Sequence, residues 1–202
     1  MSQKPRSSGR TRSFEEAEVL SGAMQAFRRH GYRGVSVRDL EVATGISVGS
    51  LYNAYGDKDG VFQAAFRHYN EVVLKGRLNR YAPAEAGLAG VREAFRTLLH
   101  EPDGGAFGCL ITNSAVELGD QESPNALVLD ALDVLRRTFT ERLTAARLAG
   151  DLPESVHPES AALQLLALYQ GVLVLVRGGY DSTALEQLIN DHFNALEGNH
   201  AP

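Results

Sequence analysis

Two features of the chain have residue types and spacings that could support catalysis or metal binding. Gly45-Ile46-Ser47-Val48-Gly49 has the G-x-S-x-G spacing of a nucleophile elbow, in which a turn between a strand and a helix exposes a serine hydroxyl. Residues 37–43, however, have helical spacing, and no His/Asp context accompanies this serine. The six histidines are scattered without ligand spacing and there is no second cysteine. We therefore expect no enzyme, no cofactor and no metal site.

Cys109 is the single cysteine, and it begins a predicted helix over 109–118. The dipole at a helix N-terminus lowers the pKa of a thiol, so Cys109 could be a redox or electrophile switch. The alternative is a small core hydrophobe, the usual role of a lone cysteine. Nearby acids (Glu101, Asp103, Glu117) would oppose thiolate formation if they lie close.

Polar candidates of another kind lie on short helices in the first sixty residues. Ser13 with Glu16 forms a capping box for a helix that His30-Gly31 closes. Ser36 starts a second helix, 37–43, and Gly45 needs a positive φ for the turn that follows. Ser47 then caps a helix over Val48–Tyr55, and Asp57 caps a long one over 58–80. Two short helices joined by a glycine-containing turn are typical of a helix-turn-helix.

Charge supports this interpretation. Residues 1–60 hold 9 Lys and Arg against 7 Asp and Glu, whereas residues 61–202 hold 11 against 18. The net charge of −5 therefore hides a positive N-terminal end, including a basic segment, 1–12, that we expect to be flexible. This segment could reach a minor groove or be a solvated leader.

Beyond Pro83 the pattern predicts longer helices, over 84–100, 109–118, 125–149, 158–177 and 182–196, with a loop at 101–108. The expected fold is all-α with about nine helices. We predict a DNA-binding domain over 13–60, linked by the helix 57–80 to a helical bundle over 61–202. The apolar run 161–176 is short of a membrane span and polar in places, so we expect a cytoplasmic protein without a membrane contact.

Residues 19–71 resemble the DNA-binding region of the TetR family of bacterial repressors. The motifs F-x-x-x-G-Y-x-x-x-S-V-R-D-L, A-T-G-I-S-x-G-S-L-Y and D-K match in order and without gaps. The resemblance implies that one set of residues contacts operator DNA: Arg38, Ser47, Val48, Gly49, Ser50, Tyr52, Asn53, Tyr55 and Lys58. Val48 departs from the polar residue common in the family, so it could read only a thymine methyl or DNA shape.

The resemblance also implies a homodimer that binds an unknown small effector. We expect four residues of the helix 158–177 at the dimer interface: Leu166, Gln170, Leu173 and Val174. A fully buried central helix is the alternative. Five residues are candidates for the effector site: Phe107, Cys109, Asn113, Tyr169 and Arg177. The segment 107–113 resembles a subgroup with a G-C-L-x-x-N signature that includes an electrophile sensor.

The leading hypothesis is a ligand-responsive transcriptional regulator, a repressor that a small effector releases from double-stranded operator DNA. The second hypothesis is a helical small-molecule or electrophile sensor or adaptor with weak or no sequence-specific DNA binding, for which Val48 is the indication.

Overall fold

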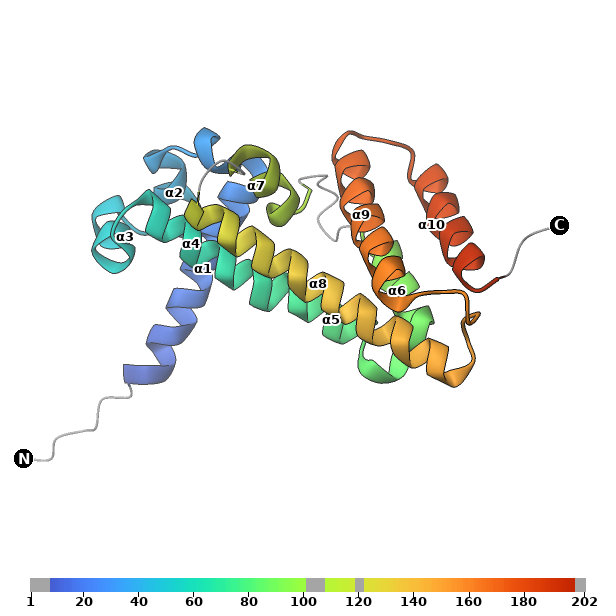
Figure 1. Cartoon of the computed structure of the whole chain (residues 1–202). Coiled ribbons are helices and arrows are strands. Elements are labelled where there is room, and N and C mark those ends of the chain that lie inside the picture. The colour runs from blue at the N-terminus through green and yellow to red at the C-terminus, as the bar shows by residue number, and fades with distance from the viewer. Residues whose placement is uncertain (1–7, 101–107, 119–121, 199–202) are drawn as a thin grey trace, which may run out of the picture. The chain divides into compact units, whose positions relative to one another are not determined.

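A computed structural model describes residues 8–100, 108–118 and 122–198, with side chains from Glu16 onward except at 122–125. Every regular element in these ranges is helical, which confirms the all-α class (Figure 1). The chain divides into two compact units, Met1–Glu71 and Val72–Pro202.

The first unit contains a long helix and three shorter ones: α1 (Ser8–Gly34), α2 (Val37–Thr44), α3 (Val48–Tyr55) and α4 (Lys58–Tyr69). Helix α1 packs on α2 and α4, and α3 packs on α2 and α4. Phe27 and Phe62 meet edge to face with ring centroids 5.1 Å apart, and Leu40 and Leu51 are fully buried. One buried leucine from each short helix thus holds α2 and α3 on the unit's core.

Helix α1 begins at Ser8, upstream of the start predicted at Ser13. No proline lies between these two residues, so nothing in the sequence stops the helix from extending toward the N-terminus. The first seven residues of the basic segment lie outside the described residues. Gly31 has φ 74° and ψ 169°, so the helical backbone breaks where the sequence predicted that it would.

The long helix predicted over 58–80 contains an interruption. Helix α4 is followed by a π-helical segment, η1 (Asn70–Lys75), and then by α5 (Gly76–Tyr81). The boundary between the two units falls inside η1. The first unit therefore extends past residue 60, because α4 packs along α1 as part of the same core. Hydrophobic spacing alone does not distinguish a π-segment from an α-helix.

The second unit is a bundle built from one 3-10 turn and further helices. After α5 they are η2 (Ala84–Ala86), α6 (Gly87–Arg96), α7 (Leu110–Leu118), α8 (Glu122–Ala149), α9 (Pro158–Arg177) and α10 (Ser182–Leu196). Helix α8 packs on α9, α7 and α6, and α10 packs on α6. An aromatic cluster of Phe95, Phe139, Tyr169 and Phe193 fills the centre.

The bounds of α9 and α10 agree with the prediction, whereas α6 is shorter than the helix expected over 84–100. Gly87 has a positive φ of 57°, which ends η2 and starts α6. An added Cβ on Gly90 of α6 would lie 2.5 Å from the carbonyl oxygen of Tyr81 at the end of α5, so only glycine fits this close approach of the two helices. Residues 101–107 of the expected loop lie outside the described residues.

Candidate nucleic-acid interface

Helix α2 is held at both of its ends. Ser36 and Asp39 form a capping box: Ser36 Oγ accepts from the Asp39 amide at 3.2 Å, and Asp39 Oδ2 accepts from the Ser36 amide at 2.8 Å. These hydrogen bonds from Ser36 hold the pKa of Asp39 below its usual value. Gly45 ends α2 with φ 72°, as the sequence predicted, and its amide donates to the carbonyl oxygen of Glu41.

Helix α3 is anchored from its N-terminus and from its buried side. Glu41 Oε1 accepts from the Val48 amide at 2.8 Å, which ties the first turn of α3 to α2. The Ser47 hydroxyl accepts from the Ser50 amide and caps the helix. Because α2 and a turn precede Ser47 instead of a strand, the nucleophile-elbow geometry is not formed. Leu51 is fully buried and fixes the inner face.

The residues predicted to contact DNA from α3 separate into two groups. Ser47, Gly49, Ser50 and Asn53 are exposed, and they form a polar outer face. Val48, Tyr52 and Tyr55 are half-buried beside it. The half-buried position of Val48 suits an apolar residue, and the exposed residues of α3 with hydrogen-bonding side chains are the serines and Asn53.

The hydroxyl of Tyr55 already has a partner inside the first unit. It hydrogen-bonds Glu16 of α1, and burial together with this carboxylate raises the pKa of Tyr55. The tyrosine therefore joins α3 to α1, whereas the sequence predicted only that it contacts the DNA backbone.

Lys58 stands at the start of α4 and lies over an aromatic ring that the sequence analysis did not select. Its Nζ is 4.7 Å from the centroid of the Tyr32 ring. The Tyr32 hydroxyl donates to Asp59, and burial and this hydrogen bond raise the pKa of Tyr32 to about 12. Asp57 Oδ1 caps α4 through the Gly60 amide at 2.9 Å. Tyr32 thus positions the cation beside the free amides of a helix N-terminus, where a phosphate can bind.

Two glycines that the sequence analysis left without a role set the spacing of these helices. An added Cβ on Gly22 of α1 would lie 2.0 Å from the carbonyl oxygen of Ala43. On Gly60 of α4 it would lie 1.8 Å from the carbonyl oxygen of Tyr55. Both positions sit where one helix meets the backbone of another, and no local pattern around either glycine indicates this.

Arg38 is exposed on α2, one turn from the side that holds α3. Its side chain lines a groove between α1 and α2. An exposed cation on the first helix of a helix-turn-helix is available for a DNA phosphate, and this contact of Arg38 stays a prediction.

The five residues expected at an effector site do not form one cluster. Phe107 lies outside the described residues, and Cys109 is buried. Tyr169 is 3% exposed and packs edge to face on Phe95 in the aromatic centre, with ring centroids 5.2 Å apart. Asn113 and Arg177 do come together: a Cβ on Gly108 would lie 3.3 Å from Asn113 Oδ1 and 3.1 Å from Arg177 Cδ.

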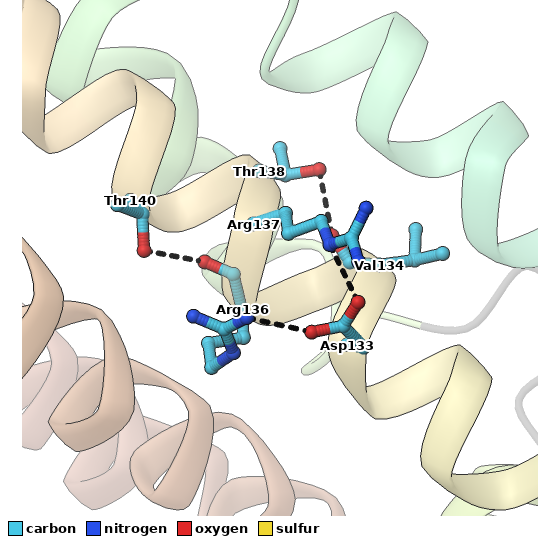
Figure 2. Close-up of polar contacts among 6 residues, drawn as sticks. All are labelled: Asp133, Val134, Arg136, Arg137, Thr138 and Thr140. Atoms are coloured by element: carbon cyan, nitrogen blue, oxygen red, sulfur yellow. Dashed lines mark hydrogen bonds and ion pairs between the residues drawn. The ribbon is translucent and has the colours of Figure 1, made fainter.

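A second charged cluster lies on α8 and is satisfied within that helix. Figure 2 shows Asp133 between two arginines of the next turn, 2.7 Å from Arg136 Nη2 and 2.5 Å from Arg137 Nε. The hydrogen bond from Arg136 is the largest cause of the lowered pKa of Asp133. Thr138 and Thr140 donate to carbonyl oxygens four residues earlier. The described residues contain no cluster of His, Cys, Asp and Glu that could hold a metal ion.

The four residues expected at a dimer interface also differ in exposure. Leu173 is 4% exposed and belongs to the unit's own core, and Gln170 accepts a hydrogen bond from the Thr112 hydroxyl. Leu166 is half-buried, and Val174 is 52% exposed. An interface on α9 would therefore use the face one step around the helix from Leu173. That exposed face carries Leu163, Ala167, Gly171, Val174 and Leu175.

By length and composition alone, α9 also meets the criteria for a membrane-spanning helix. Its mean hydropathy is 1.5, and 33% of the apolar window is buried. The prediction that this run is too short and too polar is wrong by these two criteria, because Pro158–Ala161 and Arg177 complete the helix. Within the described residues, α9 is the one helix that meets them.

The first unit, with its helix-turn-helix and the exposed polar side of α3, has the features of a DNA-binding regulator. Comparisons with known proteins agree. Residues 19–65 match the family model described as "Bacterial regulatory proteins, tetR family", and residues 85–191 match "Tetracyclin repressor-like, C-terminal domain". The chain belongs to the TetR family and is a TetR-like transcriptional repressor.

Individual relatives and structures support this assignment. The chain is similar to the HTH-type transcriptional repressor ComR of Escherichia coli K12, with 27% identity over 188 residues, 91% of this chain and 89% of ComR. It is 31% identical to the HTH-type transcriptional repressor AcnR of Corynebacterium jeikeium over 160 residues, 78% of this chain and 79% of AcnR. A cysteine mutant of the TetR family regulator CifR, solved with 26-bp double-strand operator DNA, superposes with a TM-score of 0.78 at 25% identity, covering 95% of this chain and 99% of CifR. These relatives are transcriptional regulators rather than enzymes.

Proposed function

We propose that the chain is a homodimeric repressor whose two α3 helices bind operator DNA and whose second unit binds a small effector that releases the DNA. The observation that carries the DNA-binding part is the exposed polar face of Ser47, Ser50 and Asn53 above the buried Leu51. A short helix with one leucine anchor and a polar outer side is suited to enter a major groove. The CifR structure, which contains double-strand operator DNA, supports DNA binding by this chain.

Within this proposal each DNA-contacting residue has a role. Ser47, Ser50 and Asn53 face base edges or their phosphates, with Gly49 allowing close approach. Tyr52 and Lys58 bind the backbone on either side of the recognition helix. Val48 contributes packing and contact with a thymine methyl, so specificity depends in part on DNA shape. The first unit is the DNA-binding domain, and the protein acts in the cytoplasm.

The experiment is a binding titration with DNA from upstream of the chain's own reading frame. Lys58→Ala should weaken binding and reduce the salt slope by about 1.8, because the dimer loses two phosphate contacts worth about 0.9 each. Tyr52→Ala should weaken binding as well. Arg147→Ala removes an exposed cation from the second unit and is the matched control. Binding that both first-unit variants leave unchanged would favour the sensor or adaptor hypothesis over a repressor.

The dimer part of the proposal commits the exposed face of α9 to a second copy of the chain. Leu163 and Val174 are each more than half exposed, and Ala167 and Gly171 between them allow a close helix approach. A twofold dimer also supplies two α3 helices, as binding to two successive major grooves requires, whereas a single chain has one. Val174 is the one residue of the predicted interface set that is exposed on this face.

The effector part rests on Asn113 and Arg177, since the structure brings these two together next to Gly108. Removal of either side chain should weaken the release of DNA that the effector causes, without weakening DNA binding itself. The resemblance to the G-C-L-x-x-N subgroup adds one question, which is whether Cys109 acts as an electrophile switch. Because Cys109 is 4% exposed, the core role is favoured over the electrophile switch. Mass spectrometry after mild electrophile treatment decides between them: an unmodified Cys109 in the folded protein contradicts the switch.

A further inference from the structure

A groove of about 390 Å³ lies between α1 and α2 in the first unit, and among its lining residues only Arg38 is predicted to contact DNA. Its floor is made of the small residues Gly22, Ala26 and Ala43. Longer side chains line its rim: Gln25, Arg29, His30, Arg38, Asp39 and Val42. All six rim residues are exposed, so a ligand can reach them from solvent.

The walls of the groove are fixed by backbone contacts. Gly22 meets the carbonyl oxygen of Ala43 so closely that no Cβ could be added. The capping box between Ser36 and Asp39 holds the first turn of α2. The separation between Arg29 on α1 and Arg38 on α2 is therefore set by rigid elements, which is a condition for a preorganised site.

The charge of the rim is positive. The lining residues include two guanidinium groups, of Arg29 and Arg38, and one carboxylate, of Asp39, so the lining has a net positive charge even when His30 is neutral. That carboxylate already accepts hydrogen bonds from the Ser36 amide at 2.8 Å and the Ser36 hydroxyl at 2.6 Å. The groove is thus complementary to an anion.

The groove also lies on the side of α2 where a DNA backbone would pass. Glu41 points toward α3, because it accepts from the Val48 amide, and Ala43 touches α1. At about 100° per residue, Arg38 and Val42 lie between these two directions, on the outer side of α2. In a helix-turn-helix the first helix crosses the backbone while the second enters the major groove. The outer side of α2 is then next to the phosphates that border this groove.

We propose that the groove between α1 and α2 binds a phosphate of the DNA backbone, held by Arg29 together with Arg38. The proposal rests on the function proposed above and adds a contact from α1, outside the helix-turn-helix. A phosphate contact carries no base information, so it strengthens binding to operator and to random DNA alike.

The test measures affinity of the full chain for a random-sequence duplex of about 40 bp, long enough for two half-sites with flanks. Titrations at about 50 mM and about 200 mM salt give the salt slope, which changes by about 0.9 for each phosphate contact. Arg29→Ala removes one contact from each subunit of the dimer, so the slope should change by about 1.8. Between these two concentrations, wild-type affinity should therefore fall about 12-fold more than that of Arg29→Ala. Arg29→Lys keeps the charge and should keep most of the slope.

A gain-of-contact variant avoids the ambiguity of a damaged fold. Val42 is 80% exposed on the rim, so Val42→Lys adds a cation without disturbing the core. It should tighten binding to the random duplex and raise the salt slope. Arg67→Ala is the control: Arg67 is exposed on α4, hydrogen-bonds Gln63 and lies outside the groove. Its slope should equal that of the wild type.

Wild-type slopes in both Arg29→Ala and Val42→Lys, in a protein that does bind the duplex, would overturn the phosphate site and leave the proposed function intact. The same result is expected if the groove instead holds an acidic protein segment. A wild-type chain that binds no duplex at either salt concentration would overturn the proposed function and this site together.

Discussion

Replacement of Gly22 by alanine tests whether the close approach of α1 and α2 holds the first unit together. The added Cβ would lie 2.0 Å from the carbonyl oxygen of Ala43 and 2.8 Å from its carbonyl carbon. Real Cβ atoms essentially never come within 3.0 Å of another atom, so the two helices must separate by about 1 Å. Both contacted atoms belong to the backbone, so no side chain can rotate away to relieve them.

The magnitude follows from two opposing effects. Overpacking of this kind costs about 1–3 kcal/mol, occasionally more. Alanine regains about 1 kcal/mol over glycine inside a helix. Because both contacted atoms belong to the backbone, we expect a cost in the upper part of that range, about 2–3 kcal/mol. The expected net loss is therefore about 1–2 kcal/mol, or a Tm about 4–16 °C lower for a unit of this size.

The assay is thermal unfolding followed by helical signal, with Gly76→Ala as the matched control. Gly76 lies in α5 with nothing within 4 Å of an added Cβ, so its replacement should leave Tm unchanged or raise it. DNA binding should weaken in Gly22→Ala alone, because α2 carries α3. A Tm of Gly22→Ala at or above that of the wild type would refute the close approach.

Three further changes test separate parts of the account. Ser36→Ala removes the cap of α2 and should lower the free energy of unfolding by about 1 kcal/mol, measured by urea titration; no change would contradict the capping box. The raised pKa of Tyr32, about 12 against an ordinary 10.0, means that its stabilising effect is complete below pH 10.0 and is lost as pH rises toward 12. The urea concentration at the midpoint of unfolding should therefore fall between pH 10 and 12 in the wild type, and it should fall less in Tyr32→Phe. An equal fall of the midpoint in both proteins would show that the contact with Asp59 is absent. Val174→Glu places a charge on the exposed face of α9 and should shift sedimentation from dimer to monomer with the helical signal kept, whereas an intact dimer would assign the interface elsewhere.

Much of the first unit could be predicted from the sequence because its signals are local. Ser36 and Asp39 are three residues apart, and Gly45 directly follows the last turn of α2. The polar outer side of α3 also follows from helical spacing, with Leu51 on the opposite side. Caps, turns and amphipathic faces depend on neighbours within a few residues, so one sequence is sufficient to identify them.

Contacts between distant residues could not be predicted in the same way. The approach of Gly22 to Ala43 and the placement of Lys58 over Tyr32 depend on how whole helices pack. The π-segment after α4 has no periodic signature that separates it from α-helix. Leu173 illustrates the same limit: an apolar helix with two apolar faces does not show which face the bundle buries.

Hydroxyl-radical footprinting of the chain on DNA from upstream of its own reading frame tests the central claim most directly. A dimer that places one α3 in each of two successive major grooves should protect two patches about one helical turn apart, on one face of the duplex. Lys58→Ala should weaken both patches equally, because the two subunits are identical. Uniform cleavage, or a single protected patch at saturating protein, would contradict a dimeric repressor that binds DNA through α3.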